Sequence, residues 1–267
     1  MRPILLTATL LRLTTARTLN IVAHQDDDIL FFSPELLHDI HSGNPVRTIF
    51  LTAGDAGNSV EYWEGRQAGS QAAYALMRGV SNTWTRSDAG VADHPVSIFT
   101  MNDDPNISLA FLHLPDGNLD GSGFPATGTT SLVKLWNGQI QKLDTVDGLT
   151  KYTNESLVET LTDLMRKFEP EQVKTQDYIQ GGGDHSDHHT GAKFAREAAR
   201  VYDAGVKLTG YLGYPVVELP ENVQGSELEV KQAAFYKYGM HDAHTCDSQE
   251  TCKDRVEAQW LARQYTV

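Results

Sequence analysis

The chain has 267 residues, of which 40% are hydrophobic and 21% are charged, and this composition argues against long disorder, collagen-like repeats and a coiled-coil rod. Acidic side chains outnumber basic ones by 35 to 22, which gives a formal net charge of −13 with histidine neutral. A surface this negative repels nucleic-acid phosphates and anionic membranes, and no stretch approaches the ~18 apolar residues that a membrane span needs.

The N-terminal segment does not have the form of a typical signal peptide. It starts with Arg2 and a short apolar run, but Arg12 interrupts that run and threonine-rich sequence follows. A secretory signal has a longer apolar region and a small-residue cleavage site. We therefore interpret residues 1–16 as a leader of unusual form or as a lead-in strand or helix.

Short apolar runs alternate with amphipathic stretches along the rest of the chain, which is typical of an α/β layer fold. The apolar runs predict strands at residues 19–23, 46–52, 96–101, 109–114, 173–175 and 210–217. Helical spacing and capping residues predict helices from residue 33 onward and at residues 63–78, 154–168, 190–202, 227–238 and 255–264.

These elements predict a single domain over residues 1–267, built as a Rossmann-like three-layer sandwich with a mostly parallel sheet. Residues 116–152 are rich in Gly, Thr and Asp and predict a lid or small insertion. Residues 226–267 form a predicted C-terminal helical segment. Ligands of such sheets bind at the carboxyl ends of the strands.

Two polar clusters each follow a predicted strand. The first cluster is Ala23-His24-Gln25-Asp26-Asp27-Asp28, and the second is Gly181-Gly182-Gly183-Asp184-His185-Ser186-Asp187-His188-His189. Neighbouring carboxylates repel one another unless a cation lies close by. Two histidines and one carboxylate with an open position are the ligands of a hydrolytic zinc site. Acidic triplets and histidine clusters also occur as solvated loops, but the position of both clusters at strand ends favours a metal site.

The two clusters resemble the paired signatures of the PIG-L/LmbE-like zinc-dependent N-acetylglucosaminyl de-N-acetylases. Residues 23–28 resemble the Ala-His-Pro-Asp-Asp-Glu signature, and residues 185–188 resemble the second signature, His-Pro-Asp-His. Residues 52–57, followed by Arg66 on a helix, are similar to the substrate-side segment of that family. The resemblance covers most of residues 18–200. It implies removal of the acetyl group from N-acetylglucosamine in a larger conjugate, such as a glycolipid, a thiol precursor or a glycopeptide antibiotic.

The resemblance also implies a role for each matching residue. One zinc ion per chain would be held by His24, Asp27 and His188. Asp26 would be the general base, and His185 would stabilise the tetrahedral intermediate or protonate the leaving amine. The remaining candidates are Asp187, which would orient His185, and three substrate-binding residues, Arg66, Asp116 and His241.

Three positions depart from the family pattern. Gln25 replaces the proline, Asp28 replaces the glutamate, and Gly183 stands where some members carry a tyrosine that helps to stabilise the oxyanion. Tyr178 and His241 are candidates for the missing role. These departures leave two alternatives open, namely a catalytically silent carbohydrate-binding protein and a zinc amidase that acts on a non-sugar amide.

Cys246 and Cys252 are the only cysteines, and they lie six residues apart in a polar stretch. This spacing favours a small disulfide loop and therefore a secreted or extracytoplasmic protein. Two unpaired cysteines in a cytoplasmic enzyme are the alternative. The sequence does not decide the oligomeric state.

Overall fold

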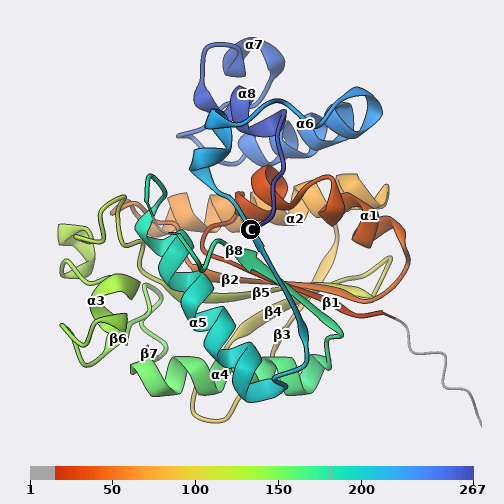
Figure 1. Ribbon diagram of the computed structural model, residues 1–267. Helices are drawn as coiled ribbons and strands as arrows, with labels where there is room; N and C mark the ends of the chain where they lie inside the picture. Colours follow the sequence, from red (N-terminus) through yellow and green to blue (C-terminus); the bar gives the residue numbers. More distant parts are fainter. Residues whose placement is uncertain (1–15, 181) are drawn as a thin grey trace, which may run out of the picture.

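The protein is described by a computed structural model that covers residues 16–180 and 182–267. A seven-stranded sheet has the order β3-β4-β5-β2-β1-β8-β9 (Figure 1). The strands are β1 (Thr18–Val22), β2 (Val46–Thr52), β3 (Trp84–Asp88), β4 (Ser97–Met101), β5 (Ile107–Leu114), β8 (Gln172–Gln176) and β9 (Lys207–Tyr211). Pairing is parallel from β5 to β9 and antiparallel where β4 contacts β3 and β5. The expected α/β fold with a mostly parallel sheet is confirmed.

Helices cover both faces of this sheet (Figure 1). One face carries a π-helical turn η1 (Asp28–Phe32), α1 (Glu35–His41) and α2 (Val60–Arg78), with the C-terminal helices α6 (Gly225–Gly239), α7 (Gln249–Cys252) and α8 (Val256–Leu261) beyond them. The other face carries α3 (Leu132–Trp136), α4 (Asn154–Phe168) and α5 (Ser186–Tyr202). None of the helices in the described residues combines the length and the hydrophobicity of a membrane-spanning helix.

The buried central strands explain why the fold can be recognised from sequence. Every residue of β1 and β5 is buried, because helices pack on both sides of them. Alternate residues of β1 then enter opposite cores: Val22 packs with Phe50 on one face, and Leu19 and Ile21 pack with Leu51 on the other. Such strands read as continuous apolar runs rather than as an alternating pattern.

Some elements differ from those expected. The predicted strand at residues 210–217 is shorter: β9 ends at Tyr211, and a 3-10 helix η3 (Tyr214–Glu218) follows, because Pro215 lacks the N–H that a ladder requires. Strand β3 was not expected, because it is an edge strand with mainly exposed side chains. Residues 116–152 contain η2 (Pro125–Thr127), α3 and a hairpin of β6 (Leu143–Asp144) and β7 (Lys151–Tyr152). The expectation for residues 1–16 falls almost wholly outside the described residues.

Cys246 and Cys252 form a disulfide, as expected. Both residues are buried, at 3% and 1% exposure, although the sequence around them is polar. They belong to the same hydrophobic core as η1 and α6. The disulfide therefore links C-terminal segments that pack in the same core as the turn that follows β1.

Candidate active site

The two polar clusters meet at the carboxyl ends of β1 and β8. These strands are parallel neighbours, so the segments that leave them emerge at the same edge of the sheet. Gln176 at the end of β8 accepts a hydrogen bond from the Ala23 N–H at 3.0 Å, which joins the two strand ends. The structure thereby brings His24 and His188 together, with 3.3 Å between Nδ1 of His24 and Nε2 of His188.

A carboxylate of Asp27 completes a group of three metal-ligand atoms. Its Oδ2 lies 3.2 Å from His24 Nδ1, and its Oδ1 lies 2.9 Å from His188 Nε2. All three side chains are buried, with exposures of 5% for His24, 2% for Asp27 and 0% for His188. Two imidazoles and one carboxylate that face a common point are the donor set of a hydrolytic zinc site.

Each of these imidazoles has a second carboxylate behind it. His188 Nδ1 donates to Asp184 Oδ1 at 2.8 Å, and His24 Nε2 lies 3.4 Å from Asp187 Oδ2. Metal-binding histidines usually contact a carboxylate or carbonyl through the nitrogen that does not bind the metal, because this contact fixes the ring and its tautomer. The buried His24 Nε2 has no hydrogen-bond partner among the described residues. The residues present therefore fit a divalent metal ion.

The charges of this group depend strongly on one another. Burial lowers the pKa of His188, but Asp27 and Asp184 outweigh burial and raise the pKa to about 10. Burial raises the pKa of Asp27, but the two histidines outweigh burial and lower that pKa well below its usual value. Asp27 is therefore ionised, as a metal ligand must be.

Asp26 lies beside this group and is held by Arg66 from α2. Arg66 Nη2 donates to Asp26 Oδ1 at 2.8 Å, and Arg66 Nη1 donates to the Gly54 carbonyl at 2.8 Å. Arg66 Nε donates to the Tyr238 hydroxyl at 2.6 Å and lies 3.0 Å from Asp242 Oδ2. Burial raises the pKa of Asp26 to about 6, although Arg66 opposes that shift. The guanidinium, expected to bind substrate, is thus engaged by protein groups on each side.

His185 is the N-cap residue of α5, and its tautomer follows from its contacts. Its Nδ1 accepts the backbone N–H of Asp187 at 3.2 Å, so the proton of a neutral ring resides on Nε2. Nε2 lies 3.6 Å from Asp116 Oδ1. Burial and the neighbouring His24 lower the pKa of His185, which keeps the ring neutral. The Asp187 carboxylate lies 3.8 Å from His185 Nδ1, farther than from His24.

Asp116 and Asp187 are held in place by backbone groups of the loops around them. The Asp116 N–H donates to Asp55 Oδ1 at 2.8 Å, and the Gly117 N–H donates to Asp187 Oδ2 at 2.7 Å. A side chain at position 117 would come within 2.4 Å of Asp187 Oδ1, so glycine is required there by the close approach. The start of the segment 116–152 therefore packs directly against the site.

A cavity of about 90 Å³ opens onto these groups. Its lining residues come from both halves of the chain: His24, Asp26, Asp27, Leu30, Arg66, Asp116, His185, Tyr214 and Trp260. His241 is exposed, follows the end of α6 and does not line this cavity. Sequence reasoning missed Asp184, whose only signal is its position one turn before His188. It also missed Tyr214 and Trp260, for which the sequence gives no local signal.

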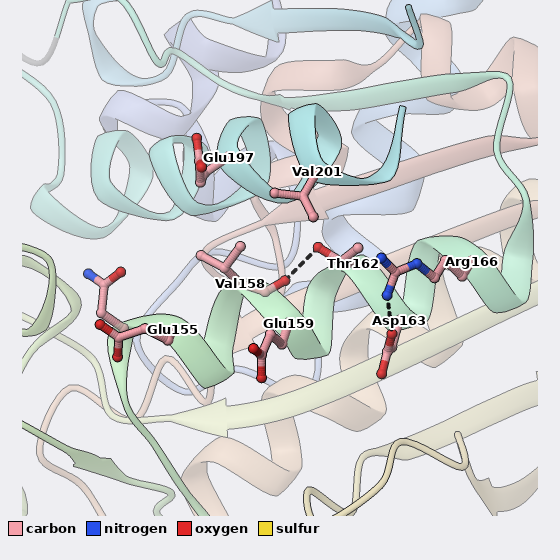
Figure 2. Close-up of a pocket in the computed structure, with 9 residues that line it drawn as sticks. Glu155, Val158, Glu159, Thr162, Asp163, Arg166, Glu197 and Val201 are labelled. Carbon is pink, nitrogen blue, oxygen red and sulfur yellow. Dashed lines mark hydrogen bonds and ion pairs between the residues drawn. The ribbon is translucent and has the colours of Figure 1, made fainter. Parts of the chain in front are cut away.

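A separate groove of about 560 Å³ runs between α4 and α5 (Figure 2). Four acidic side chains and one arginine line it, and Arg166 donates to Asp163 at 2.8 Å. Its lining residues include no histidine, cysteine or serine that could serve as a metal ligand or nucleophile. The groove therefore lacks the chemistry found at the strand ends.

Comparison with known proteins identifies the family of the chain. The family model PIG-L, described as GlcNAc-PI de-N-acetylase, matches residues 19–199. No curated protein is significantly similar to the chain.

Several solved structures are similar to the chain. A deacetylase triple mutant from the teicoplanin biosynthetic pathway is 16% identical with a TM-score of 0.50, over 91% of this chain and 89% of that one. The N,N'-diacetylchitobiose deacetylase from Pyrococcus horikoshii is 16% identical with a TM-score of 0.50, over 90% and 75%. The 4-carboxy-2-hydroxymuconate hydratase GalB from Pseudomonas putida is 14% identical with a TM-score of 0.49, over 92% and 82%. At 16% identity, the likeness to the two deacetylases concerns the fold alone.

Proposed function

The chain belongs to the PIG-L family, and from this premise we propose that it is a zinc-dependent hydrolase that removes the acetyl group from an N-acetylglucosamine residue of a larger conjugate. The observation that carries the proposal is the position of Asp26 and His185 around one cavity, beside the convergent ligand atoms of His24, Asp27 and His188. A binding protein has no need for a base and a hydrogen-bond donor that face the same small space.

In this proposal His24, Asp27 and His188 hold one zinc ion. A bound zinc ion acts as a Lewis acid that polarises the amide carbonyl and makes water more acidic. Asp184 would fix the ring of His188 through its hydrogen bond to Nδ1, and Asp187, 3.4 Å from His24 Nε2, would orient the His24 ring.

Asp26 acts as the general base. Its carboxylate accepts a proton from the attacking water, and Arg66 keeps it ionised and oriented. A positioned base of this kind contributes roughly 10²–10⁴-fold to the rate. The same carboxyl then returns the proton to the departing amine nitrogen, because a group with a pKa near 6 exchanges protons readily at neutral pH.

His185 acts as a neutral hydrogen-bond donor rather than as an imidazolium acid. The Asp187 N–H occupies its Nδ1, so Nε2–H faces the cavity side, where negative charge develops on the amide oxygen. Donors placed in advance at that position stabilise the tetrahedral intermediate without reorganisation. Asp116 is then the candidate residue for binding a hydroxyl group of the sugar, because Arg66 is already hydrogen-bonded to Asp26.

The small size of the cavity supports a substrate whose acetamide group enters and whose remainder stays outside. A space of about 90 Å³ suits a group of the size of an acetamide, and the cavity is open, so the rest of the conjugate can remain outside. The attached group is a glycolipid, a thiol precursor or a glycopeptide core in our proposal. The disulfide between Cys246 and Cys252 supports a location outside the cytoplasm.

The test combines metal analysis with acetate release. Protein purified without a chelator is expected to contain about one zinc per chain and to release acetate from N-acetylglucosamine conjugates until a chelator is added. The Asp26→Ala variant should retain zinc and lose turnover. Folded protein that binds no zinc would refute the ligand set, and zinc-loaded protein that releases no acetate from any conjugate would refute the proposed reaction.

A further inference from the structure

Two aromatic residues from the C-terminal part of the chain form one wall of the cavity. Tyr214 begins η3 and Trp260 lies in α8, and their rings stack with centroids 4.5 Å apart and an angle of 7° between planes. Both residues line the cavity together with Leu30. Both residues lie beyond residue 199, where the match to the family model ends.

The stack is fixed on both sides. The Trp260 ring packs edge-on against Phe31 at 5.7 Å, and the Tyr214 ring packs edge-on against His188 at 5.0 Å. The Tyr214 N–H also donates to Asp184 Oδ1 at 3.1 Å, the carboxylate oxygen that accepts from His188. The wall is therefore anchored to the same residues that position the candidate metal ligands.

A buried lysine fixes the end of α8. Lys231 from α6 is 1% exposed, and its Nζ donates to the Arg263 carbonyl at 2.8 Å and to the Trp260 carbonyl at 3.4 Å. Carbonyls at a helix C-terminus lack partners within the helix, so this contact satisfies them and restrains the backbone that carries Trp260.

The cavity thus has two chemically different sides. Asp26, His185 and their neighbours form the polar side, and Leu30, Tyr214 and Trp260 form the apolar side. An acetamide group has the same division, with a polar carbonyl and amide at one end and a methyl group at the other.

We propose that Trp260, stacked on Tyr214, is a specificity-determining residue that closes the acyl side of the cavity and restricts the enzyme to acetyl groups. The inference rests on the proposed function. In the proposed orientation the methyl group of the acetamide lies against this wall, so a longer acyl chain would meet the indole ring. Replacement of the indole by a smaller side chain extends the cavity in the direction of the acyl chain.

The experiment compares N-acetyl- and N-butyrylglucosamine conjugates as substrates of the zinc-loaded full chain. Trp260→Ala and Trp260→Leu are expected to raise the butyryl-to-acetyl ratio of kcat/KM at least about tenfold, because even one methylene in a closed pocket changes selectivity by about 10–200-fold. Trp260→Phe keeps the aromatic wall and removes only the N–H, so it should leave the ratio near the wild-type value.

Trp136→Leu is the matched control. Trp136 packs edge-on against Phe194 in the opposite core, so this variant loses an indole of similar burial away from the cavity and should not change the ratio. A folded Trp260→Leu variant with an unchanged butyryl-to-acetyl ratio would overturn the inference. If both substitutions at 260 prevent folding, Tyr214→Leu opens the same wall from η3 and replaces them in the comparison.

A second readout separates this inference from the proposed function. Binding of the product carboxylates acetate and butyrate to zinc-loaded protein is measured by calorimetry. Wild-type protein should prefer acetate, and Trp260→Leu should lose that preference. If the wild-type protein hydrolyses no conjugate but prefers acetate, and Trp260→Leu loses that preference, the proposed function is refuted and the role of the wall is retained. If the wild-type protein and Trp260→Leu have the same ratio of acetate to butyrate affinity, the proposed role of the wall is refuted.

Discussion

Arg66 Nη2 donates to Asp26 Oδ1 at 2.8 Å, while Arg66 Nε on the same guanidinium lies 3.0 Å from Asp242 Oδ2. Asp26 follows the first strand of the sheet, whereas Asp242 follows α6 in the C-terminal part of the chain. Asp242 also accepts from Tyr62 at 3.1 Å and from Tyr238 at 2.6 Å. The orientation of the proposed base therefore depends on the C-terminal helices as well as on the strand that carries it.

Removal of Arg66 should shift the pH dependence of the reaction. Asp26 must be ionised to accept a proton, so activity falls as the pH decreases through its pKa. Burial raises that pKa to about 6 and Arg66 opposes the rise, so Arg66→Met should raise it further and move the acidic limb of kcat/KM to higher pH by about one unit. The control is Arg86→Met, which alters an exposed arginine of β3. A profile that coincides with that of wild type would contradict the role of Asp26.

The carboxylate behind His188 should tune metal affinity. Asp184→Asn preserves an oxygen that can accept from His188 Nδ1 but removes the negative charge. Loss of such an outer partner weakens metal binding about 10–100-fold in proteins of this kind. Competition with a chromogenic chelator measures the zinc affinity of the variant. Asp203→Asn, at the exposed end of α5, is the control, and equal affinities for the two variants would show that Asp184 does not act on the metal.

We expect that only glycine is tolerated at position 117, because the Asp187 side chain lies very close to it. A Cβ atom at this position would lie 2.4 Å from Asp187 Oδ1 and 3.0 Å from Ser131 Cβ. Gly117→Ala should therefore push Asp187 away from His24 and reduce zinc affinity and acetate release together. Gly182→Ala is the matched control, because no heavy atom lies within 4 Å of its added Cβ atom. Similar losses in both variants would point to a general effect of alanine in these loops.

Reduction of the disulfide should destabilise the C-terminal helices. Closure of a loop this short is worth about 2 kcal/mol of unfolding free energy in the chain-entropy model. Added reductant should lower the unfolding temperature of wild type but not that of the double variant Cys246→Ser/Cys252→Ser. Because Asp242 lies just before the loop, activity should fall with stability. An unfolding temperature that does not respond to reductant would contradict the expected contribution of this bond.

The parts of the fold that could be predicted are those encoded locally. The strand that ends before His24 has a clear apolar pattern and is followed by polar residues that can bind a metal. The helix that begins after His185 also has a clear apolar pattern, and such residues lie at its start. Because parallel strands end at one edge of a sheet, the convergence of these two clusters follows from the fold class.

The parts that could not be predicted depend on contacts between distant segments. The Tyr214–Trp260 stack exists because α8 packs against η1 and η3, and no spacing in the sequence signals that contact. The hydrogen bond between Arg66 and Asp26 also requires the α2 side chain to reach across the turn after β1. Strand β3 lacks an apolar pattern, because its side chains lie at an exposed edge.

Asp147 should stabilise the fold at neutral pH but not in strong acid. Its Oδ2 contacts His113 Nδ1 at 2.9 Å, and its Oδ1 accepts from Thr145 at 2.6 Å. Burial raises the pKa of Asp147, but these hydrogen bonds outweigh burial and lower the pKa to about 2 from an ordinary value of 3.8. A lowered pKa in the folded state means that stabilisation is complete above about pH 4 and disappears as the pH falls toward 2.

Because Asp147 is partly exposed, we expect Asp147→Asn to reduce the unfolding free energy by about 1 kcal/mol at pH 6, after allowance for solvent screening. Urea unfolding between pH 6 and pH 2.5 measures this difference, which should shrink steadily as the solution becomes more acidic. Asp144→Asn changes an exposed neighbour in the same hairpin and should show no such trend. A difference that stays constant across the range would mean that Asp147 stabilises the hairpin through its shape rather than through its charge.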